Sequence, residues 1–294
     1  MRRERAFPLC ALLSLAAASA QAQANPEWRE WNQPVEPVRI AANLHYVGAS
    51  DIASYLITTP EGHILIDGGF VETAPQIAAN VEKLGHRLAD VKILLNSHAH
   101  FDHAGGLAEL KRRSGAQLFA SAPDAELLER GGKGDFRFGD EGAFPPVAVD
   151  RRLADGEKVT LGGVELTARL TPGHTRGCTT WTWNAGGLQA VVVCSASILD
   201  YRFVGQESYP GIAADFERTF ATLQALPCDL FLASHGRFFD LDGKRTLALR
   251  GMGMRNPFVD PAGYKAWAAE AESAFRAAVE RQRQELAAPD KGER

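Results

Sequence analysis

Residues 92–106 read KILLNSHAHFDHAGG, an apolar run followed at once by three histidines and an aspartate. In extended backbone the side chains of His98, His100 and Asp102 point to one side of the chain. His103 joins them only if the chain turns, and the small residues that follow permit such a turn. We therefore expect a strand that ends just before this motif and places several polar side chains together.

The chemistry of the motif indicates a metal site. Imidazole and carboxylate donors at this density suit zinc better than calcium or magnesium; a solvated histidine cluster without metal is the alternative. Four donors on one loop cannot complete two tetrahedral sites, so we expect further ligands elsewhere. His174 and His235 each follow an apolar run, as the motif does. His45, His63 and His86 lack ligand-like neighbours and are expected to be structural or surface residues.

The rest of the chain has a mixed α/β pattern in two similar halves, separated by a glycine-rich loop at 131–142. A helix is expected at 74–84, and apolar runs typical of strands lie at 54–58, 63–66, 92–95, 158–161, 164–170, 178–183 and 189–194. This alternation predicts an α/β fold with two sheets packed face to face and helices outside.

Two terminal segments have their own patterns. Residues 25–37 combine tryptophans and prolines, which favours an irregular arm with neither helix nor strand. Residues 264–286 carry Trp267, Phe275 and Val279 at helical spacing, together with Ala271, and predict one amphipathic helix packed against a sheet.

The N-terminus resembles a secretory leader. Arginines at positions 2, 3 and 5 precede an apolar run at 9–18 and the small-residue pattern Ala20-Gln21-Ala22. The run is shorter than the ~20 residues of a spanning helix, which favours a cleaved signal peptide at 1–22 over a membrane anchor. Residues 23–294 are then expected to form one periplasmic domain. Cleavage makes the formal net charge more negative than −4, which argues against nucleic-acid or anionic-membrane partners.

Three cysteines remain after cleavage: Cys178, Cys194 and Cys228. If the strands around residues 184–188 form a hairpin that is symmetric about Gly186, Cys178 lies opposite Cys194. We favour a disulfide there, because an oxidising compartment allows it. A free or zinc-binding Cys194 thiol is the alternative.

The motif at 98–103, together with Gly173-His174-Thr175 and Ala233-Ser234-His235-Gly236, resembles the metallo-β-lactamase superfamily. The resemblance covers nearly all of the chain after the leader. It implies a four-layer αββα sandwich with the metals at one edge between the sheets. Asp67-Gly68-Gly69 matches an early turn of the family, whose aspartate is expected to support the metal loop; a plain turn residue is the alternative.

The resemblance also implies site residues. The first of two zinc ions is expected on His98, His100 and His174, and the second on Asp102, His103 and His235, with Asp102 also orienting the attacking hydroxide. The presence of His103, with Ser195 where subclass B1 carries a cysteine, resembles subclass B3. In that subclass Ser195 and Ser197 are expected to bind the substrate carboxylate, whereas ordinary strand-end hydroxyls are the alternative.

The expected function is a zinc-dependent β-lactamase that opens the β-lactam amide through a metal-bound hydroxide. The expected partner is a small β-lactam, without nucleic acid or membrane, and the chain is expected to be a monomer. A glyoxalase II-like thioester hydrolase or a lactonase of the same fold is the alternative, since fold does not determine substrate. Cys194 stands where those relatives carry a metal-bridging aspartate, which weakens that alternative. A third alternative is a periplasmic zinc-binding protein that catalyses no reaction.

The leader generates a test. The exported protein should begin near Gln23, because Ala20 and Ala22 satisfy the small-residue requirement of signal cleavage. Intact mass spectrometry of periplasmic protein measures this directly. Retention of Met1 in that fraction would contradict the prediction.

Overall fold

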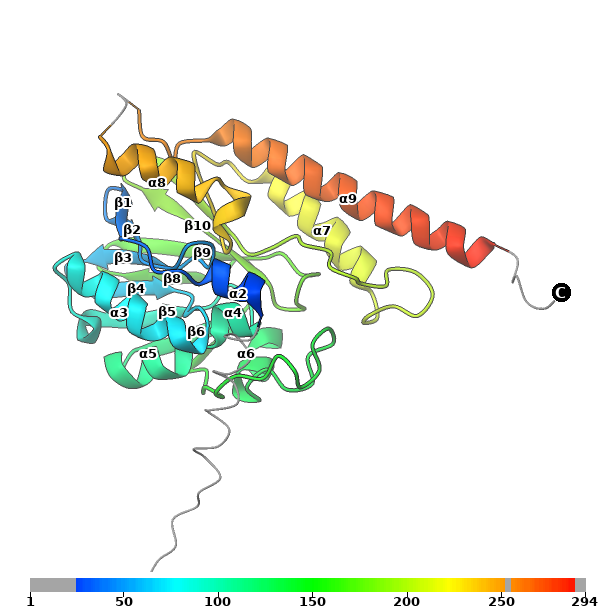
Figure 1. Cartoon of the computed structure of the whole chain (residues 1–294), viewed down its shortest axis with the longest axis horizontal. Coiled ribbons are helices and arrows are strands. Elements are labelled where there is room, and N and C mark those ends of the chain that lie inside the picture. Colours follow the sequence, from blue (N-terminus) through cyan, green and yellow to red (C-terminus); the bar gives the residue numbers. More distant parts are fainter. Residues whose placement is uncertain (1–24, 252–254, 289–294) are drawn as a thin grey trace, which may run out of the picture.

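Two β-sheets face each other with helices on both outer sides in the computed structural model, which describes residues 25–251 and 255–288 (Figure 1). The first sheet has seven strands in chain order: β1 (Val38–Ala41), β2 (Leu44–Tyr46), β3 (Tyr55–Thr59), β4 (Gly62–Ile66), β5 (Val91–Leu95), β6 (Gln117–Ser121) and β7 (Arg151–Leu153). The second has the order β12 (Leu230–Ala233), β11 (Leu188–Val193), β10 (Thr179–Ala185), β9 (Val164–Leu170) and β8 (Lys158–Leu161). The predicted α/β sandwich is confirmed, whereas the predicted leader at 1–22 lies outside the described residues.

Helices form the two outer layers. The helices of the first half are α2 (Pro26–Trp31), α3 (Ala74–Lys83), α4 (Phe101–Ala104), α5 (Leu107–Ser114) and α6 (Ala122–Glu129). The second half contributes α7 (Ile212–Ala225), α8 (Leu241–Leu249) and α9 (Pro261–Ala287), and three short 3₁₀ turns lie at Val71–Thr73, Leu88–Asp90 and Gly236–Phe238. In the part of the chain that is described, no helix is long and apolar enough to cross a membrane.

Strand alternation divides the core into layers. In β3, Ile57 belongs to the cluster between the sheets, whereas Leu56 belongs to the cluster under the helices of the first half. This is the period of two that a strand imposes on its side chains. Trp181 of β10 is fully buried in the cluster between the sheets. Such burial contributes roughly 25 cal/mol per Å² of apolar surface removed from water.

Strand direction brings the loops of the motif together. Strands β4 to β7 run parallel, so the loops after β4 and β5 emerge at the same edge. There Asp67 donates its backbone N–H to Leu95 O at 2.9 Å. The second sheet joins this edge, because Thr179 N donates to Ser97 O at 2.8 Å and Ala53 N donates to Ser234 O at 2.9 Å.

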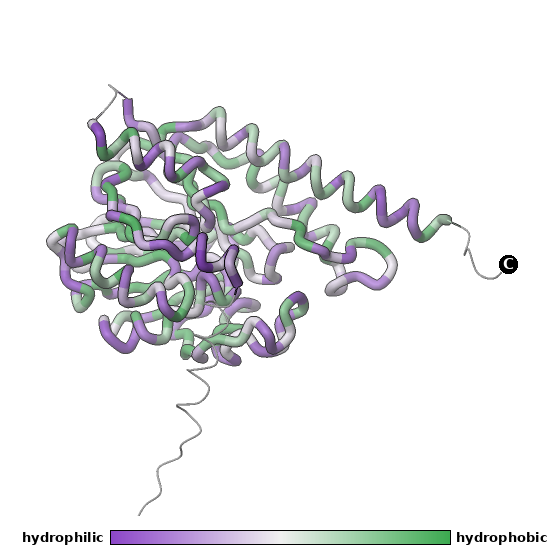
Figure 2. Tube along the Cα trace, viewed as in Figure 1, coloured by the Kyte–Doolittle hydropathy of each residue, from purple (hydrophilic) through white to green (hydrophobic). Residues whose placement is uncertain are grey.

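The C-terminal helix α9 differs in part from its prediction. The helix is present, and Tyr264 near its start contacts Phe231 of β12, as expected for packing on a sheet. Farther along, Phe275 stacks on Phe216 of α7 with ring centroids 5.4 Å apart, so this part packs on a helix and not on a sheet. Figure 2 shows hydrophilic and hydrophobic residues alternating along α9, as expected for a helix with one buried face.

The irregular arm predicted at 25–37 is wrong for its first part. The six-residue helix α2 begins after Asn25, whose side chain accepts the backbone N–H of Glu27 at 2.9 Å. Pro26 occupies the first helical turn, where the absence of an N–H costs no hydrogen bond. The prolines indicated a loop, but at this position a proline starts a helix.

The predicted disulfide between Cys178 and Cys194 is present, with Cα atoms 5.8 Å apart, and Cys228 is free. The predicted register is wrong by one residue, because Ala185 pairs with Leu188 and the hairpin is centred between Gly186 and Gly187. Both bridged cysteines lie just beyond the ends of β10 and β11. The hydrogen-bonded pairing of β10 with β11 therefore does not include the two cysteines and does not determine their positions.

The three histidines outside the motif segments form a cluster of their own. His86 lies between the other two, with its ring centroid 4.7 Å from His63 and 6.1 Å from His45. Burial lowers the pKa of His45 to about 4, with smaller effects from His86 and Arg39. Burial also lowers the pKa of His63. The side chains of His45 and His63 are therefore neutral at pH 7, which agrees with the structural role predicted for them.

This cluster generates a pH prediction. An unfolded histidine titrates near pH 6.5, so below that pH the unfolded chain binds more protons than the native state, whose His45 pKa is about 4. Stability should therefore fall as the pH falls from about 6.5 toward about 4. A His45→Gln variant should show a smaller fall than the unmodified protein, measured by denaturant unfolding of both metal-free proteins. Equal losses in the two proteins would contradict the prediction.

Candidate metal centre

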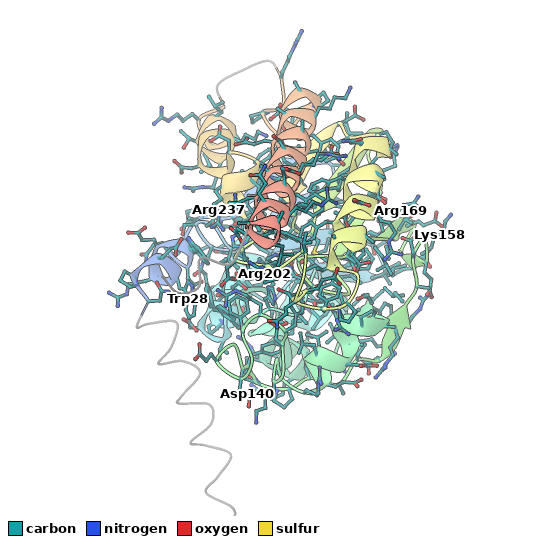
Figure 3. All side chains as sticks on the ribbon, turned by 90° about the vertical axis from the view of Figure 1, so that its right-hand side faces the viewer. Trp28, Asp140, Lys158, Arg169, Arg202 and Arg237 are labelled. Atoms are coloured by element: carbon teal, nitrogen blue, oxygen red, sulfur yellow. A yellow bond between two sulfur atoms is a disulfide. The ribbon has the colours of Figure 1, made fainter. Side chains whose placement is uncertain are left out.

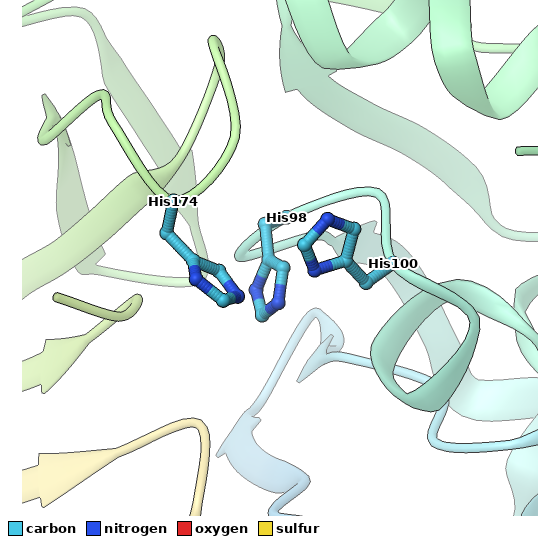
Figure 4. A group of neighbouring side chains, drawn as sticks. All are labelled: His98, His100 and His174. Carbon is cyan, nitrogen blue, oxygen red and sulfur yellow. The ribbon is translucent and has the colours of Figure 1, made fainter. Parts of the chain in front are cut away.

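Three histidines from two loops converge at the edge of the sheets. His98 and His100 follow β5, and His174 lies in the loop after β9 (Figure 4). One ring nitrogen of each lies within 4.8 Å of the others. The Nε2 atoms of His98 and His100 are buried and have no hydrogen-bond partner among the described residues. Because buried polar atoms are normally satisfied, this geometry indicates a ligand bound between them.

A second group lies beside the first. His103 Nε2 is 3.2 Å from His235 Nε2, and Asp102 Oδ2 is 3.2 Å from the first of these atoms and 3.5 Å from the second. The ring of His98 lies 4.2 Å from that of His103, so the groups adjoin. All six side chains that the sequence predicted as ligands are thus brought together.

The turn that brings His103 into place depends on close backbone packing. Helix α4 begins after His100, whose carbonyl accepts the N–H of His103 at 3.0 Å. Gly68 N then donates to His103 O at 2.8 Å. A Cβ on Gly106 would lie 2.2 Å from Gly68 O, so a larger residue there would separate the two loops. A glycine at position 106 is therefore required by this contact.

Asp67 has the supporting role predicted for it. Its Oδ1 accepts the backbone N–H of Ser97 at 2.7 Å and the Asn96 amide at 3.1 Å, while Oδ2 lies 3.7 Å from His103 Nδ1. Its backbone φ of +62° is a left-handed conformation that aspartate tolerates better than most residues. Burial raises the pKa of this carboxyl to about 6, against the opposing effect of His103.

The two distant histidines are oriented through their other ring nitrogens. His174 Nδ1 lies 2.9 Å from Ser197 O, and His235 Nδ1 lies 2.8 Å from Asp51 Oδ2. A carbonyl or carboxylate partner accepts the Nδ1–H and so fixes the tautomer of the ring. Nε2 is then unprotonated and can bind a metal ion. Sequence reasoning missed Asp51, because it lies 184 residues before His235 in a loop without a motif.

Asp124 joins the two histidine loops and was also missed. Its carboxylate accepts Ala99 N at 3.0 Å, Thr175 Oγ1 at 2.8 Å and Gly177 N at 3.0 Å. Burial raises its pKa to about 6, against the opposing effect of these hydrogen bonds. Asp124 lies in the first turn of α6, where acidic residues are common for local reasons. Nothing in the sequence around it therefore indicated a link between loops.

Protonation states favour metal binding. Burial lowers the pKa of four of the five histidines, His98, His100, His174 and His235, with His100 at about 4. Burial also disfavours the charged form of His103, but the Asp102 carboxylate outweighs this effect and raises its pKa. Burial likewise opposes ionisation of Asp102, and the neighbouring histidines overcome it and lower its pKa. The four histidines with lowered pKa values therefore offer neutral imidazoles and Asp102 offers an ionised carboxylate, and both are donors that zinc requires.

The predicted substrate residues lie next to the first group. Ser195 is only 2% exposed, and its Oγ accepts the N–H of Ser197 at 3.2 Å. Ser197 is half-buried. Cys178 and Cys194 also lie near His98, but their disulfide leaves no thiolate to bind a metal. The zinc-thiolate alternative is therefore wrong.

The model of the metallo-β-lactamase superfamily matches residues 47–235, which include every residue of both groups. The chain belongs to this superfamily. A Cronobacter sakazakii metallo-β-lactamase with an HARLDQ motif is 43% identical, with a TM-score of 0.84 over 87% of this chain and 98% of that one. The native Legionella gormanii metallo-β-lactamase is 43% identical, with a TM-score of 0.82 over 86% and 98%. A subclass B3 metallo-β-lactamase of Bradyrhizobium japonicum is 38% identical, with a TM-score of 0.81 over 88% and 98%.

These matches identify the chain as a hydrolase of this class that resembles subclass B3, and they imply a divalent metal. The HARLDQ motif of the Cronobacter protein shares its first, second and fifth letters with residues 98–103 here. Its arginine and glutamine correspond in this pattern to His100 and His103. The present chain therefore has two more imidazole donors in the motif.

Curated relatives match a shorter part of the chain. The hydroxyacylglutathione hydrolase of Acidiphilium cryptum is 31% identical over 169 residues, which are 56% of this chain and 58% of that protein. The hydroxyacylglutathione hydrolase of Rhodospirillum rubrum is 31% identical over 104 residues, 35% of this chain and 32% of that protein. The chain thus spans less than two thirds of these relatives, and they show a shared fold without showing a shared substrate.

The link through Asp124 generates a stability prediction. An Asp124→Ala substitution should lower the free energy of unfolding by about 2–4 kcal/mol, because it leaves two buried backbone N–H groups and one hydroxyl without their acceptor. Urea unfolding measures the change. The control is Asp242→Ala, which removes an exposed carboxylate and should alter stability by less than about 0.5 kcal/mol. Equal effects in the two variants would contradict the role of Asp124.

Proposed function

We propose that this protein is a zinc-dependent β-lactamase that hydrolyses the β-lactam amide of small-molecule antibiotics. The observation that carries the proposal is the pair of adjoining donor groups at the sheet edge. The chain also matches metallo-β-lactamases at about 40% identity across nearly their whole length. In the proposed assignment His98, His100 and His174 hold one zinc ion, and Asp102, His103 and His235 hold the other.

Three protein ligands per zinc leave a coordination position for water or substrate, as in catalytic zinc sites. Bound zinc supplies Lewis acidity and lowers the pKa of water to about 7, so that a nucleophile exists at neutral pH. Asp102 carries the one ionised carboxylate among the six donors, and we assign it the additional role of orienting the attacking water. Its position is set by the two imidazoles that lie 3.2 and 3.5 Å away.

The neighbouring loops supply the proposed substrate contacts. Ser195 and Ser197 are the proposed partners of the substrate carboxylate, since they follow β11 beside His174. Across the site, Phe138 of the glycine-rich loop lies edge-on to His100 with ring centroids 4.9 Å apart. An aromatic wall at this position suits the apolar part of a bicyclic ligand and excludes water from the reacting carbonyl.

A thioester hydrolase of the glyoxalase II kind is the second candidate, favoured by the hydroxyacylglutathione hydrolases among the curated relatives. By the resemblance described above, such enzymes place a metal-bridging aspartate where this chain has Cys194. That residue is engaged in a disulfide and offers no carboxylate. The β-lactam assignment is therefore the better supported of the two.

We also propose export to the periplasm after cleavage of residues 1–22, with 23–294 acting as one monomeric domain. The disulfide supports an oxidising compartment, because such bonds rarely persist in the cytosol. The negative net charge gives no electrostatic basis for binding nucleic acid or anionic lipid.

A substrate panel tests the function. Zinc-loaded protein should hydrolyse a chromogenic cephalosporin or a carbapenem and should leave a glutathione thioester nearly unchanged. Chelation should abolish the activity and added zinc should restore it, because no side chain supplies the nucleophile. Turnover of the thioester alone would favour the second candidate, and full activity after verified zinc removal would exclude the metal mechanism.

Single substitutions separate metal binding from substrate binding. His235→Ala should lower kcat at least about 100-fold, because it removes a ligand whose metal supplies several kcal/mol of transition-state stabilisation. Ser195→Ala should mainly raise KM, by about tenfold. Ser114→Ala removes a hydroxyl at the end of α5 and serves as the matched control with unchanged kinetics. A covalent acyl-enzyme trapped on Ser195 would refute this division of roles.

A further inference from the structure

Asp51 contacts the second donor group from a loop that carries no metal motif. It lies between β2 and β3, and its Oδ2 is 2.8 Å from Nδ1 of His235. Its side chain is 13% exposed, so solvent only partly screens this contact. Of the two imidazole nitrogens, Nδ1 faces Asp51 and Nε2 faces Asp102 and His103.

The Asp51 carboxylate is itself held in place. Arg237 donates its backbone N–H to Asp51 Oδ1 at 2.7 Å, and its guanidinium donates to Oδ2. The backbones are joined as well, because Gly236 N donates to Asp51 O at 2.6 Å and Ile52 forms an isolated bridge with His235. Asp51 therefore has little freedom to move away from the imidazole.

Helix α2 closes the same side of the site. The ring of Trp31 meets the ring of His235 edge-on, with centroids 5.4 Å apart. The Arg237 guanidinium lies over the Trp31 ring at 4.6 Å, and Trp31 O accepts the N–H of Asp51 at 2.9 Å. Figure 3 shows Trp28 of α2 and Arg237 among the labelled side chains of this view. His235 is thus bracketed by an anion and an aromatic ring.

We propose that Asp51 is a positioning residue for the second metal site. It accepts the Nδ1–H of His235, which fixes the tautomer with an unprotonated Nε2 aimed at Asp102 and His103. The first group has a different support, because Ser197 O holds His174. Loss of Asp51 should therefore weaken one zinc site and spare the other. The inference rests on the proposed two-zinc assignment but not on the identity of the substrate.

The test compares variants that remove the charge or the whole acceptor. Asp51→Asn keeps an oxygen acceptor for Arg237 and His235 without the charge, and Asp51→Ala removes both. Zinc affinity is measured by competition with a chromogenic chelator and stoichiometry by metal analysis. Asp51→Ala should weaken the affinity for the second equivalent of zinc about 10- to 100-fold and leave the affinity for the first unchanged. Asp51→Asn should weaken the affinity for the same second equivalent by a smaller factor.

Asp90→Asn is the matched control, since Asp90 is paired with Arg87 on a surface turn that contacts neither donor group. It should leave both zinc affinities unchanged. Circular dichroism of each variant checks folding, and the Asn variant retains the acceptor that Arg237 needs. If Asp51→Ala weakened the affinities for both zinc equivalents equally, or did not weaken the affinity for the second, the inference would be overturned.

The outcomes separate this inference from the proposed function. If the unmodified protein binds two zinc ions and Asp51→Ala binds the second weakly, the inference stands even when no β-lactam is hydrolysed. If the unmodified protein binds only one zinc ion, both the inference and the two-zinc assignment fail. A β-lactamase whose two zinc affinities are untouched by Asp51→Ala would retain its function and refute the role of Asp51.

Discussion

Five imidazoles and one carboxylate are buried together at one edge of two packed sheets, and the surrounding structure is organised around them. Burying such groups costs free energy unless each finds a partner. Their mutual contacts satisfy only part of that demand, because the buried Nε2 atoms of His98 and His100 have no hydrogen-bond partner among the described residues. A cation bound at the first group would supply the missing interaction and would favour the neutral imidazoles that burial already produces there.

Three aspartates outside the donor set hold this arrangement. Asp67 fixes the start of the motif, Asp124 ties the motif loop to the loop of His174, and Asp51 holds the ring of His235. Each comes from a different part of the chain, and each accepts at least one backbone N–H in addition to its contact with a side chain. The donors are therefore preorganised, which limits the entropy lost when a ligand binds.

The two halves of the molecule both contribute donors at this edge, since His98, His100, Asp102 and His103 come from the first half and His174 and His235 from the second. The disulfide between Cys178 and Cys194 lies behind His98 and joins the ends of β10 and β11. Arg202, in the loop after β11, lies 3.3 Å from Glu285 of the C-terminal helix α9, and Figure 3 labels Arg202 in front of that helix's end. Family membership follows from this architecture, whereas substrate choice depends on the loops that border it.

The sequence by itself indicated the six candidate ligands, because strand-end histidines beside an aspartate have the residue types that zinc prefers, while their division between two zinc ions came only from the family resemblance. It also indicated most strands, since a buried strand appears in the local sequence as a short apolar run bounded by turn residues. Only the tertiary structure decided the partners of those donors: Asp51 lies 184 residues from His235, and Asp124 looks like any acid in a first helical turn. The packing of α9 on α7 was hidden for the same reason, because an apolar stripe shows that a face is buried but not which surface covers it.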